Sequence, residues 1–313
     1  MVLITVNTSM KYTVVTTFNA EGYNSYGRRM IQTFLQTWPQ DVLLRVYAEG
    51  CRVIETAPNL QVLNLEGSSP KLVSFKNTWR NVPKANGDVT ADPVRSKRKD
   101  AGKGFKWHAV RFAHKVYAIF HAAEHATTEW LIWMDADMVC HSPMTVQKLL
   151  EFFPESTDLC FAGRKKFTEC GLYGMHITEP AVRSWLAEFQ HMYDDAESGI
   201  FTLDEWHDSY VFDAVRKRHA LRELNWTAHL QMGEGHPLIN CEWGAYIDHL
   251  KGERKSLGKS RSSDLQVRRK ESYWRCFFSA RMAMTNTLTC MLTVWDNSPP
   301  HWKLGATRTA QNP

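Results

Sequence analysis

Short apolar runs alternate with amphipathic stretches along the first part of the chain. Runs rich in β-branched and aromatic residues occupy 12–18, 42–48 and 60–65, and each has the length and composition of a buried strand. Between the first two runs, apolar residues recur at helical spacing over 22–38, and Pro39 then ends the pattern. Strand, helix and strand in this order and at this pitch predict parallel βαβ units.

The same alternation continues in the second part of the chain. An amphipathic helix is predicted at 105–126, and the near-continuous apolar run 129–135 follows it. A strand that is apolar on both faces is typical of the centre of a parallel sheet. Further helices are predicted near 144–153, 179–195 and 205–220, and further strands at 158–163 and 171–177. We therefore predict an α/β fold with a Rossmann-like mixed central sheet flanked by helices.

Two segments depart from this pattern. Residues 66–104 are polar and rich in Gly and Pro, and within 71–106 ten Lys or Arg stand against three Asp. We predict a basic loop insertion at 66–104, either a solvated surface loop or a lid that binds the acceptor. Residues 277–313 contain one acid, Asp296, and no Glu. They predict a C-terminal appendage of unassigned role, after a single domain that spans 1–276.

The cysteines and the N-terminus bear on location. The seven cysteines are odd in number and show no C-x-x-C spacing, so we expect neither a disulfide framework nor a zinc site. The first residues lack the features of a signal peptide, and no segment approaches the roughly 18 apolar residues of a membrane span. We therefore expect a cytoplasmic protein without a membrane span, in the host cytoplasm if a phage encodes it.

The strongest chemical signal is the sequence Asp135-Ala136-Asp137, directly after the apolar run. Two carboxylates one residue apart at a strand end can both face one cation. Mg²⁺ and Mn²⁺ prefer oxygen ligands and are typically shared between carboxylates and substrate phosphates. The alternative is a solvated turn, because Asp is common in turns. The preceding run favours the metal site.

A second signal lies more than a hundred residues further along the chain, in the segment HLKGERK. His249 could complete a carboxylate metal site as a neutral imidazole. Gly252 permits a close approach of the backbone to a phosphate, and Lys255 supplies a compact positive charge for a diphosphate. Alone, His249 is more often a surface or core histidine, and its pairing with the two aspartates favours a metal site.

These two segments together resemble a known family. WLIWMDADMV resembles the D-x-D strand of GT-A glycosyltransferases, and HLKGERK is similar to the H-x-x-G-x-x-K element of their glycogenin-like, retaining branch. The resemblance implies a GT-A-type fold, a nucleotide-sugar donor, with a UDP-sugar favoured, and a Mn²⁺ or Mg²⁺ cofactor. Asp135, Asp137 and His249 would hold the metal, and Lys255 would contact the leaving diphosphate. The branch continues with Pro-Trp after the lysine, and this chain does not.

The resemblance also implies further site residues. Donor-binding positions are Thr16, Thr17, Phe18, Tyr23, Arg111 and Lys115, in addition to Asp135, Gly252 and Lys255. Tyr26 could stack on the base. Glu169 and Asp208 resemble positions beside the donor sugar, and one of them would serve as base if the reaction inverts configuration. Each has a structural alternative, such as surface charge for Arg111 or an acid at a helix N-terminus for Asp208.

The basic segments suggest an acceptor. A second one, 251–270, holds eight Lys or Arg against two acids, and such strips can follow a phosphate backbone. Trp79 and Trp107 could stack on an exposed base. We therefore hypothesise transfer to a hydroxymethylated base in DNA, of the kind found in phages. Alternatively, the basic segments form a solvated surface, and the enzyme has a glycan, lipid or protein acceptor.

Two other classes of protein share some of these features. A nucleotidyltransferase also combines a metal with an α/β nucleotide fold, but its first loop is usually rich in glycine. Here that loop, TTFNAEGYN, has one glycine. A non-catalytic nucleic-acid-binding protein would explain the basic segments, but it gives no reason for the paired aspartates after an apolar strand.

Overall fold

The structure, a computed structural model, describes residues 11–230 and 236–279. The chain divides into two units, residues 1–269 and 270–313. The described part of the second unit contains helix α11 (Ser272–Ser279). Beyond that helix, the appendage predicted at 277–313 lies outside the described residues.

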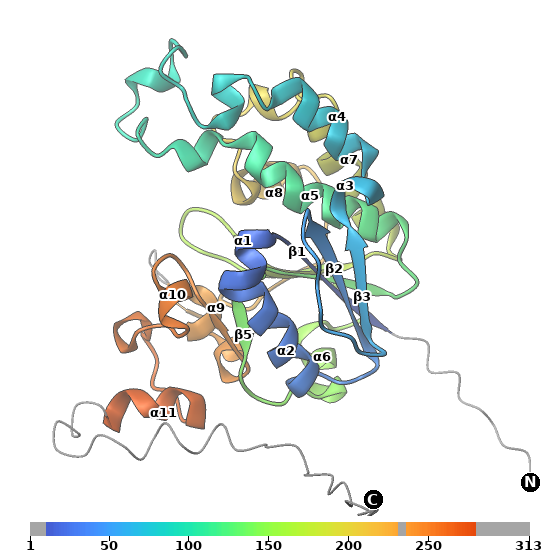
Figure 1. Cartoon of the computed structure of the whole chain (residues 1–313), viewed down its shortest axis with the longest axis vertical. Helices are drawn as coiled ribbons and strands as arrows, with labels where there is room; N and C mark the ends of the chain where they lie inside the picture. Colours follow the sequence, from blue (N-terminus) through green and yellow to red (C-terminus); the bar gives the residue numbers. More distant parts are fainter. Residues whose placement is uncertain (1–10, 231–235, 280–313) are drawn as a thin grey trace, which may run out of the picture. The chain divides into compact units, whose positions relative to one another are not determined.

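A seven-stranded sheet forms the centre of the first unit (Figure 1), in the order β3-β2-β1-β4-β7-β6-β8. Its strands are β1 (Tyr12–Asn19), β2 (Val42–Glu49), β3 (Leu60–Asn64), β4 (Trp130–Met134), β6 (Leu159–Ala162), β7 (Glu169–His176) and β8 (Glu223–Asn225). Strands β1 to β4 pair in parallel, β7 is antiparallel to β4 and to β6, and β8 is parallel to β6. The predicted mixed α/β sheet is confirmed, as are six of its seven strands; β8 was not predicted.

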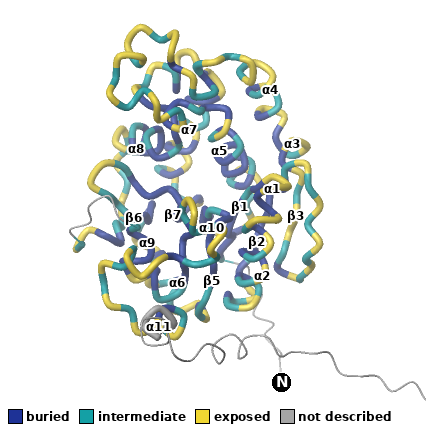
Figure 2. The backbone as a smooth tube through the Cα atoms, turned by 60° about the vertical axis from the view of Figure 1, so that its left-hand side comes forward, coloured by how far each residue is buried: buried dark blue, intermediate teal, exposed yellow. Residues whose placement is uncertain are grey.

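Helices cover both faces of this sheet. They are α1 (Ala20–Gly22), α2 (Arg28–Thr37), α3 (Leu65–Ser68), α4 (Pro70–Trp79), α5 (Ala109–Glu124), α6 (Val146–Phe152), α7 (Pro180–Asp194), α8 (Asp208–Arg216), α9 (Pro237–Asn240) and α10 (Arg254–Leu257). Helices α4, α5, α7 and α8 pack in one core, and α2, α6 and α9 pack in the other. Figure 2 shows the buried residues gathered along the strands and along α5, with β3 exposed at the edge.

Strand β4 shows how the sequence pattern produces the two cores. Trp130, Ile132 and Met134 point into the core on the α2 side, whereas Leu131 and Trp133 point into the core on the α5 side. All five side chains are buried, because successive residues of a strand face opposite sides and both sides are covered by helices. The strand, which is buried along its whole length, therefore delivers Asp135 to the edge of the sheet.

A small second sheet lies beside the end of β4. Strand β5 (Met138–Cys140) pairs antiparallel with β9 (Ile247–His249), and Met138 is opposite His249. The backbone N–H of Leu250 also donates to the carbonyl of Asp137 at 2.9 Å. This ladder joins two segments that are more than a hundred residues apart in the chain.

The prediction of a loop at 66–104 is wrong for the first part of this range, which forms α3 and α4. The Ser69 hydroxyl accepts a hydrogen bond from the Leu72 N–H at 3.3 Å, and Pro70 occupies the first turn of α4. Leu72 and Phe75 are buried in the core on the α5 side. The basic residues on the exposed face of α4 made the sequence resemble a polar loop, so this short helix was not predicted. Residues 80–103 are mostly irregular, with short 3₁₀ turns.

Within the described ranges, no helix combines the length and the apolar character that a membrane crossing requires.

Candidate active site

Three potential metal ligands meet where the two sheets adjoin. Asp135 directly follows β4, Asp137 directly precedes β5, and His249 ends β9. One ligand atom from each lies within 4.8 Å of the others. His249 Nε2 is 3.3 Å from Asp137 Oδ1 and 3.8 Å from Asp135 Oδ2. The β5–β9 register thus brings together the two sequence signals that were far apart in the chain.

The chemistry of this cluster fits a divalent cation. Asp137 Oδ1 is buried and accepts no hydrogen bond in the described part of the chain. A buried carboxylate oxygen without a donor is costly unless a cation neutralises it. Two carboxylates and one imidazole form a donor set that suits Mn²⁺ or Mg²⁺, with further positions open to phosphate oxygens. The cluster could therefore bind a metal ion.

Lys255 lies against the same carboxylate. Its ammonium group is 2.9 Å from Asp137 Oδ2 and 4.7 Å from the centre of the Tyr26 ring. Burial alone would lower the pKa of Lys255, but the charge of Asp137 outweighs it and raises the pKa. Gly252, at φ +58°, begins the turn that carries the lysine, and this left-handed conformation favours glycine. The ion pair with Asp137 thus holds the positive charge of Lys255 beside the candidate metal ligands.

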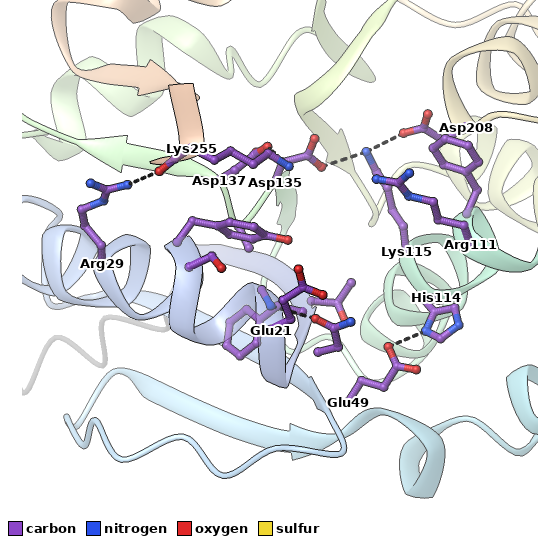
Figure 3. A pocket seen from close by; sticks show the side chains of 18 of the residues that line it. Glu21, Arg29, Glu49, Arg111, His114, Lys115, Asp135, Asp137, Asp208 and Lys255 are labelled. Atoms are coloured by element: carbon purple, nitrogen blue, oxygen red, sulfur yellow. Dashed lines mark hydrogen bonds and ion pairs between the residues drawn. The ribbon is translucent and has the colours of Figure 1, made fainter. Parts of the chain in front are cut away.

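Lys115 links the ligand cluster to helix α8. From α5, its buried ammonium group contacts Asp135 at 3.1 Å and Asp208, the first residue of α8, at 2.7 Å (Figure 3). It also donates to the carbonyl of Cys170. Burial would lower the pKa of Lys115, but the two carboxylates raise it well above its usual value. Lys115 therefore stays charged and fixes the orientation of Asp135.

Glu169 lies behind His249 and is engaged by basic groups. It pairs with Lys251, Arg164 lies 3.5 Å away, and the Gly171 N–H donates to Oε1 at 3.2 Å. His249 Nδ1 is 3.9 Å from the same oxygen. Burial alone would raise the pKa of Glu169, but the neighbouring basic groups, Lys251 first, lower it to about 2. Glu169 is thus a charged neighbour of His249 at neutral pH.

Two cavities meet at this cluster. One has a volume of about 1000 Å³ and the other about 960 Å³. Both are lined by Arg111, Phe112, Asp135, Asp137, Asp208, Gly252 and Lys255. The first extends toward α1 and α2, where Thr17, Phe18, Tyr26 and Arg29 line it (Figure 3). The second extends toward α8 and is lined by Phe105, Arg164, Phe167, Glu169 and His207 among others. A molecule that spans both cavities would pass Asp135 and Asp137, which line both.

Some acidic and basic residues of the first cavity were not predicted from the sequence. Glu49, at the carboxyl end of β2, pairs with His114 Nδ1 at 2.7 Å and with Lys76 at 3.2 Å. Burial alone would raise the pKa of Glu49, but these two partners lower it. The signal was present, because Glu49 follows a predicted parallel strand in the same way as Asp135 does. Arg29 on α2 carried no such signal.

Several residues predicted to touch ligands face elsewhere. Thr16 is fully buried in the sheet and lines neither cavity. Tyr23 stacks on Phe18, and its hydroxyl donates to Glu55 at 2.6 Å. It therefore contacts the first cavity only through Phe18, which lines it. Trp107 is fully buried, with its indole N–H donating to the Asp204 carbonyl at 2.9 Å. It cannot stack on a base, and the prediction for Trp107 is wrong.

Most basic residues of the first basic segment are paired with acids. The pairs are Lys71–Asp194, Lys76–Glu49, Lys84–Glu197, Arg95–Asp92, Arg98–Glu205 and Lys106–Glu205. Trp79 packs edge-on against Phe201 at 4.6 Å, which leaves it half-buried. The segment is therefore not a continuous strip of free positive charge, and only Arg80, Lys97, Lys99 and Lys103 in it have no ion-pair partner among the described residues.

Comparison with known proteins points to glycosyltransferases. Residues 87–224 match the family model described as "Glycosyl transferase family 2". No curated protein matches the chain. Among solved structures, mouse xyloside xylosyltransferase 1 is 12% identical with a TM-score of 0.43, and the match covers 78% of this chain and 99% of that one.

Two further solved structures match with similar sequence identities and TM-scores. The WbbM bifunctional glycosyltransferase is 10% identical with a TM-score of 0.41, over 69% of this chain and 38% of its own. The galactosyltransferase LgtC, in complex with donor and acceptor sugar analogues, is 10% identical with a TM-score of 0.37, over 68% and 72%. This chain thus spans well under half of the WbbM protein. The region of the chain that carries Lys115, Asp135, Asp137, Glu169 and Asp208 is therefore similar to glycosyl transferase family 2.

Proposed function

We propose that this protein is a metal-dependent glycosyltransferase that moves a sugar from a nucleotide-sugar donor to an acceptor hydroxyl. The observation that carries the proposal is the cluster of Asp135, Asp137 and His249 at the junction of two cavities. The family match over residues 87–224 supports the same reaction class. A junction of this kind suits a reaction between two molecules that approach one charged group from opposite sides.

The first cavity would bind the nucleoside of the donor. Phe18 and Tyr26 line it and offer aromatic faces to a base, and Thr17 lies on the same wall. Glu49, at the carboxyl end of β2, is placed where α/β folds bind a ribose. We propose a UDP-sugar as the donor.

The diphosphate would lie at the junction. Asp135, Asp137 and His249 would hold Mn²⁺ or Mg²⁺, which supplies Lewis-acid stabilisation of negative charge on the leaving diphosphate when it is bound. Lys255 adds a fixed positive charge at the same place, and Gly252 permits a close approach of the backbone. Positive charge is thus concentrated where the leaving group becomes more negative.

The acceptor hydroxyl oxygen would attack the anomeric carbon. The new C–O bond forms as the bond from that carbon to the diphosphate oxygen breaks, and the electron pair leaves with the nucleoside diphosphate. We propose that a phosphate oxygen of the leaving group takes the hydroxyl proton, with retention of configuration. In support, Glu169 and Asp208, the carboxylates considered as a base for inversion, are both held by lysines. A carboxylate held in an ion pair is a weak base.

Acceptor-independent donor hydrolysis tests this function. The protein is incubated with Mn²⁺ and a panel of nucleotide sugars, and the nucleoside diphosphate released is measured. We expect one preferred donor, loss of release with chelator, and recovery with Mn²⁺. Release of pyrophosphate instead would indicate a nucleotidyltransferase. Absence of release with every donor, together with absence of transfer to glycan, lipid, protein or DNA acceptors, would refute the proposal.

A further inference from the structure

The second cavity has an excess of positive charge. Its acids other than the metal ligands are already paired, Asp100 with Lys106, Glu169 with Lys251 and Asp208 with Lys115. Three further cations line it, Lys103, Arg111 and Lys166, all exposed and with no ion-pair partner among the described residues. Arg111 also lines the first cavity, so Lys103 and Lys166 are the two of these three cations that line the second cavity alone. The charge balance therefore favours an anionic ligand.

One side of the same cavity is aromatic. The ring centroid of Phe167 is 5.0 Å from that of His207, and that of Phe105 is 6.1 Å from it. Phe105 is 50% exposed, which is unusual for so large an apolar side chain. His207 is fixed, because Nε2 is 3.0 Å from Glu205 Oε2 and Nδ1 accepts from the Tyr210 N–H. The cavity thus combines an aromatic side, with His207 held in place, and the side chains of Lys103 and Lys166.

Unpaired lysines continue beyond the cavity along the chain. Lys97 and Lys99 precede Lys103, and Lys165 is next to Lys166, all exposed and without an ion-pair partner among the described residues. A small anion would need only the charges inside the cavity. A strand with repeated charges would also use those outside it. The distribution therefore favours a polyanion over a single anionic group.

We propose that the second cavity binds one nucleotide of a nucleic-acid strand as the acceptor, with its base against Phe105 and Phe167 and its phosphates near Lys103 and Lys166. This role rests on the glycosyl transfer proposed above, because the base must carry the hydroxyl that attacks the donor. Stacking on aromatic rings combined with backbone contacts to lysines is how proteins bind single strands. A base in a duplex would have to leave the stack to reach the junction.

The bonds formed and broken are those of the glycosyl transfer proposed above. The hydroxymethyl oxygen of the base bonds to the anomeric carbon, the anomeric carbon–diphosphate bond breaks, and the proton goes to the departing phosphate. No further reactant is needed. The proposed substrate class is thus a nucleic-acid strand whose base carries a hydroxyl group, such as a hydroxymethylated pyrimidine.

Binding is tested with a short fluorescent single-stranded oligonucleotide containing 5-hydroxymethylcytosine, across a range of salt concentrations. The Lys103→Gln/Lys166→Gln variant should reduce the slope of log Kd against log salt by about 1.4, at roughly 0.7 per phosphate contact on a single strand. The matched control Arg52→Gln/Lys217→Gln removes two exposed charges that lie outside both cavities and have no ion-pair partner within 11–230 and 236–279, and it should leave the slope unchanged. Equal slopes for the two variants would overturn the proposal.

The stacking role is tested with Phe105→Ala, which should weaken oligonucleotide binding by roughly ten-fold or more. Circular dichroism checks that the fold survives. Transfer is then measured with hydroxymethylated oligonucleotide, the matching mononucleotide, unmodified oligonucleotide, acidic glycans, neutral glycans and peptides. We expect transfer to the hydroxymethylated strand above all others. Transfer to a glycan or peptide with none to modified DNA would overturn this inference, while donor hydrolysis by the unmodified protein tests the proposed function separately.

Discussion

At the residue scale, the site depends on Asp137, whose two oxygens have different partners. Oδ1 faces His249 at 3.3 Å and accepts no hydrogen bond from the described residues, while Oδ2 faces Lys255 at 2.9 Å. Burial alone would raise the pKa of Asp137, but these two neighbours lower it below its usual value. The carboxylate therefore stays charged, and one of its oxygens remains available for a cation.

The first prediction concerns this carboxylate. Asp137→Asn removes the charge at nearly constant shape, so the fold should survive while Mn²⁺ affinity falls by at least about 100-fold, beyond the range known for neighbours of ligands. Calorimetric titration with Mn²⁺ measures the affinity, and circular dichroism checks the fold. Unchanged Mn²⁺ affinity in a folded variant would remove Asp137 from the metal site.

The second prediction concerns Lys255. Lys255→Ala should lower kcat more than it raises KM for the donor, because charge on the diphosphate grows in the transition state. The loss should be about 2–4 kcal/mol in activation free energy, by analogy with the removal of one oxyanion donor. Steady-state kinetics with the preferred donor measure both constants. If the variant has wild-type kinetics, the similarity of HLKGERK to the family element is coincidental.

At the element scale, the site forms where β4, β5, β7 and β9 meet. The sequence predicted Asp135 and Asp137 correctly as a pair at a strand end, because apolar patterning identifies a central strand. It could not predict that Met138 lies opposite His249, because β5 and β9 are three-residue strands with too little pattern to identify. His249 was proposed from the segment HLKGERK and from the family resemblance, and not from a predicted strand. The Lys115–Asp208 pair likewise joins two helices whose packing no local pattern encodes.

The third prediction tests the packing of β7 against His249. A Cβ at Gly171 would lie 2.4 Å from His249 Cε1, a distance that forces the ring to move. Gly171→Ala should lower Mn²⁺ affinity by about 10–100-fold, comparable to the loss of a group that orients a ligand. It should also destabilise the fold by about 1–3 kcal/mol through overpacking.

Gly102→Ala is the matched control, because a Cβ there meets nothing within 4 Å. Mn²⁺ titration and thermal unfolding should show wild-type behaviour for this variant. Equal metal affinity for the two variants would mean that the position of His249 does not determine metal binding.

At the scale of the whole molecule, one buried ion cluster joins the irregular segment 80–103 to the start of α8. Glu205 accepts from Lys106 at 2.7 Å and Arg98 at 3.0 Å, and His207 Nε2 lies 3.0 Å away. Burial alone would raise the pKa of Glu205, but its hydrogen-bond partners lower it to about 2. The basic composition of the segment suggested a solvated loop, and the sequence did not show that acids elsewhere in the chain would anchor it.

The fourth prediction follows from this lowered pKa. The folded-state pKa of Glu205 is below the unfolded value of about 4.3, so its contribution to stability is present above roughly pH 5 and is lost as the pH falls toward 2. Glu205→Gln should lower the free energy of unfolding by about 1.5–3 kcal/mol at neutral pH. The difference between variant and wild type should shrink in acid. Urea unfolding at several pH values measures it, and a constant difference would contradict the assignment.

The most direct test of the central claim is release of nucleoside diphosphate from a nucleotide sugar, measured for the wild type and for Asp137→Asn, each with Mn²⁺ and with chelator. We predict release by the wild type with Mn²⁺, at least about 100-fold less release from the variant with Mn²⁺, and no release from either protein with chelator. Release at the same rate by both proteins in the presence of chelator would contradict a metal-dependent glycosyltransferase built on Asp135, Asp137 and His249.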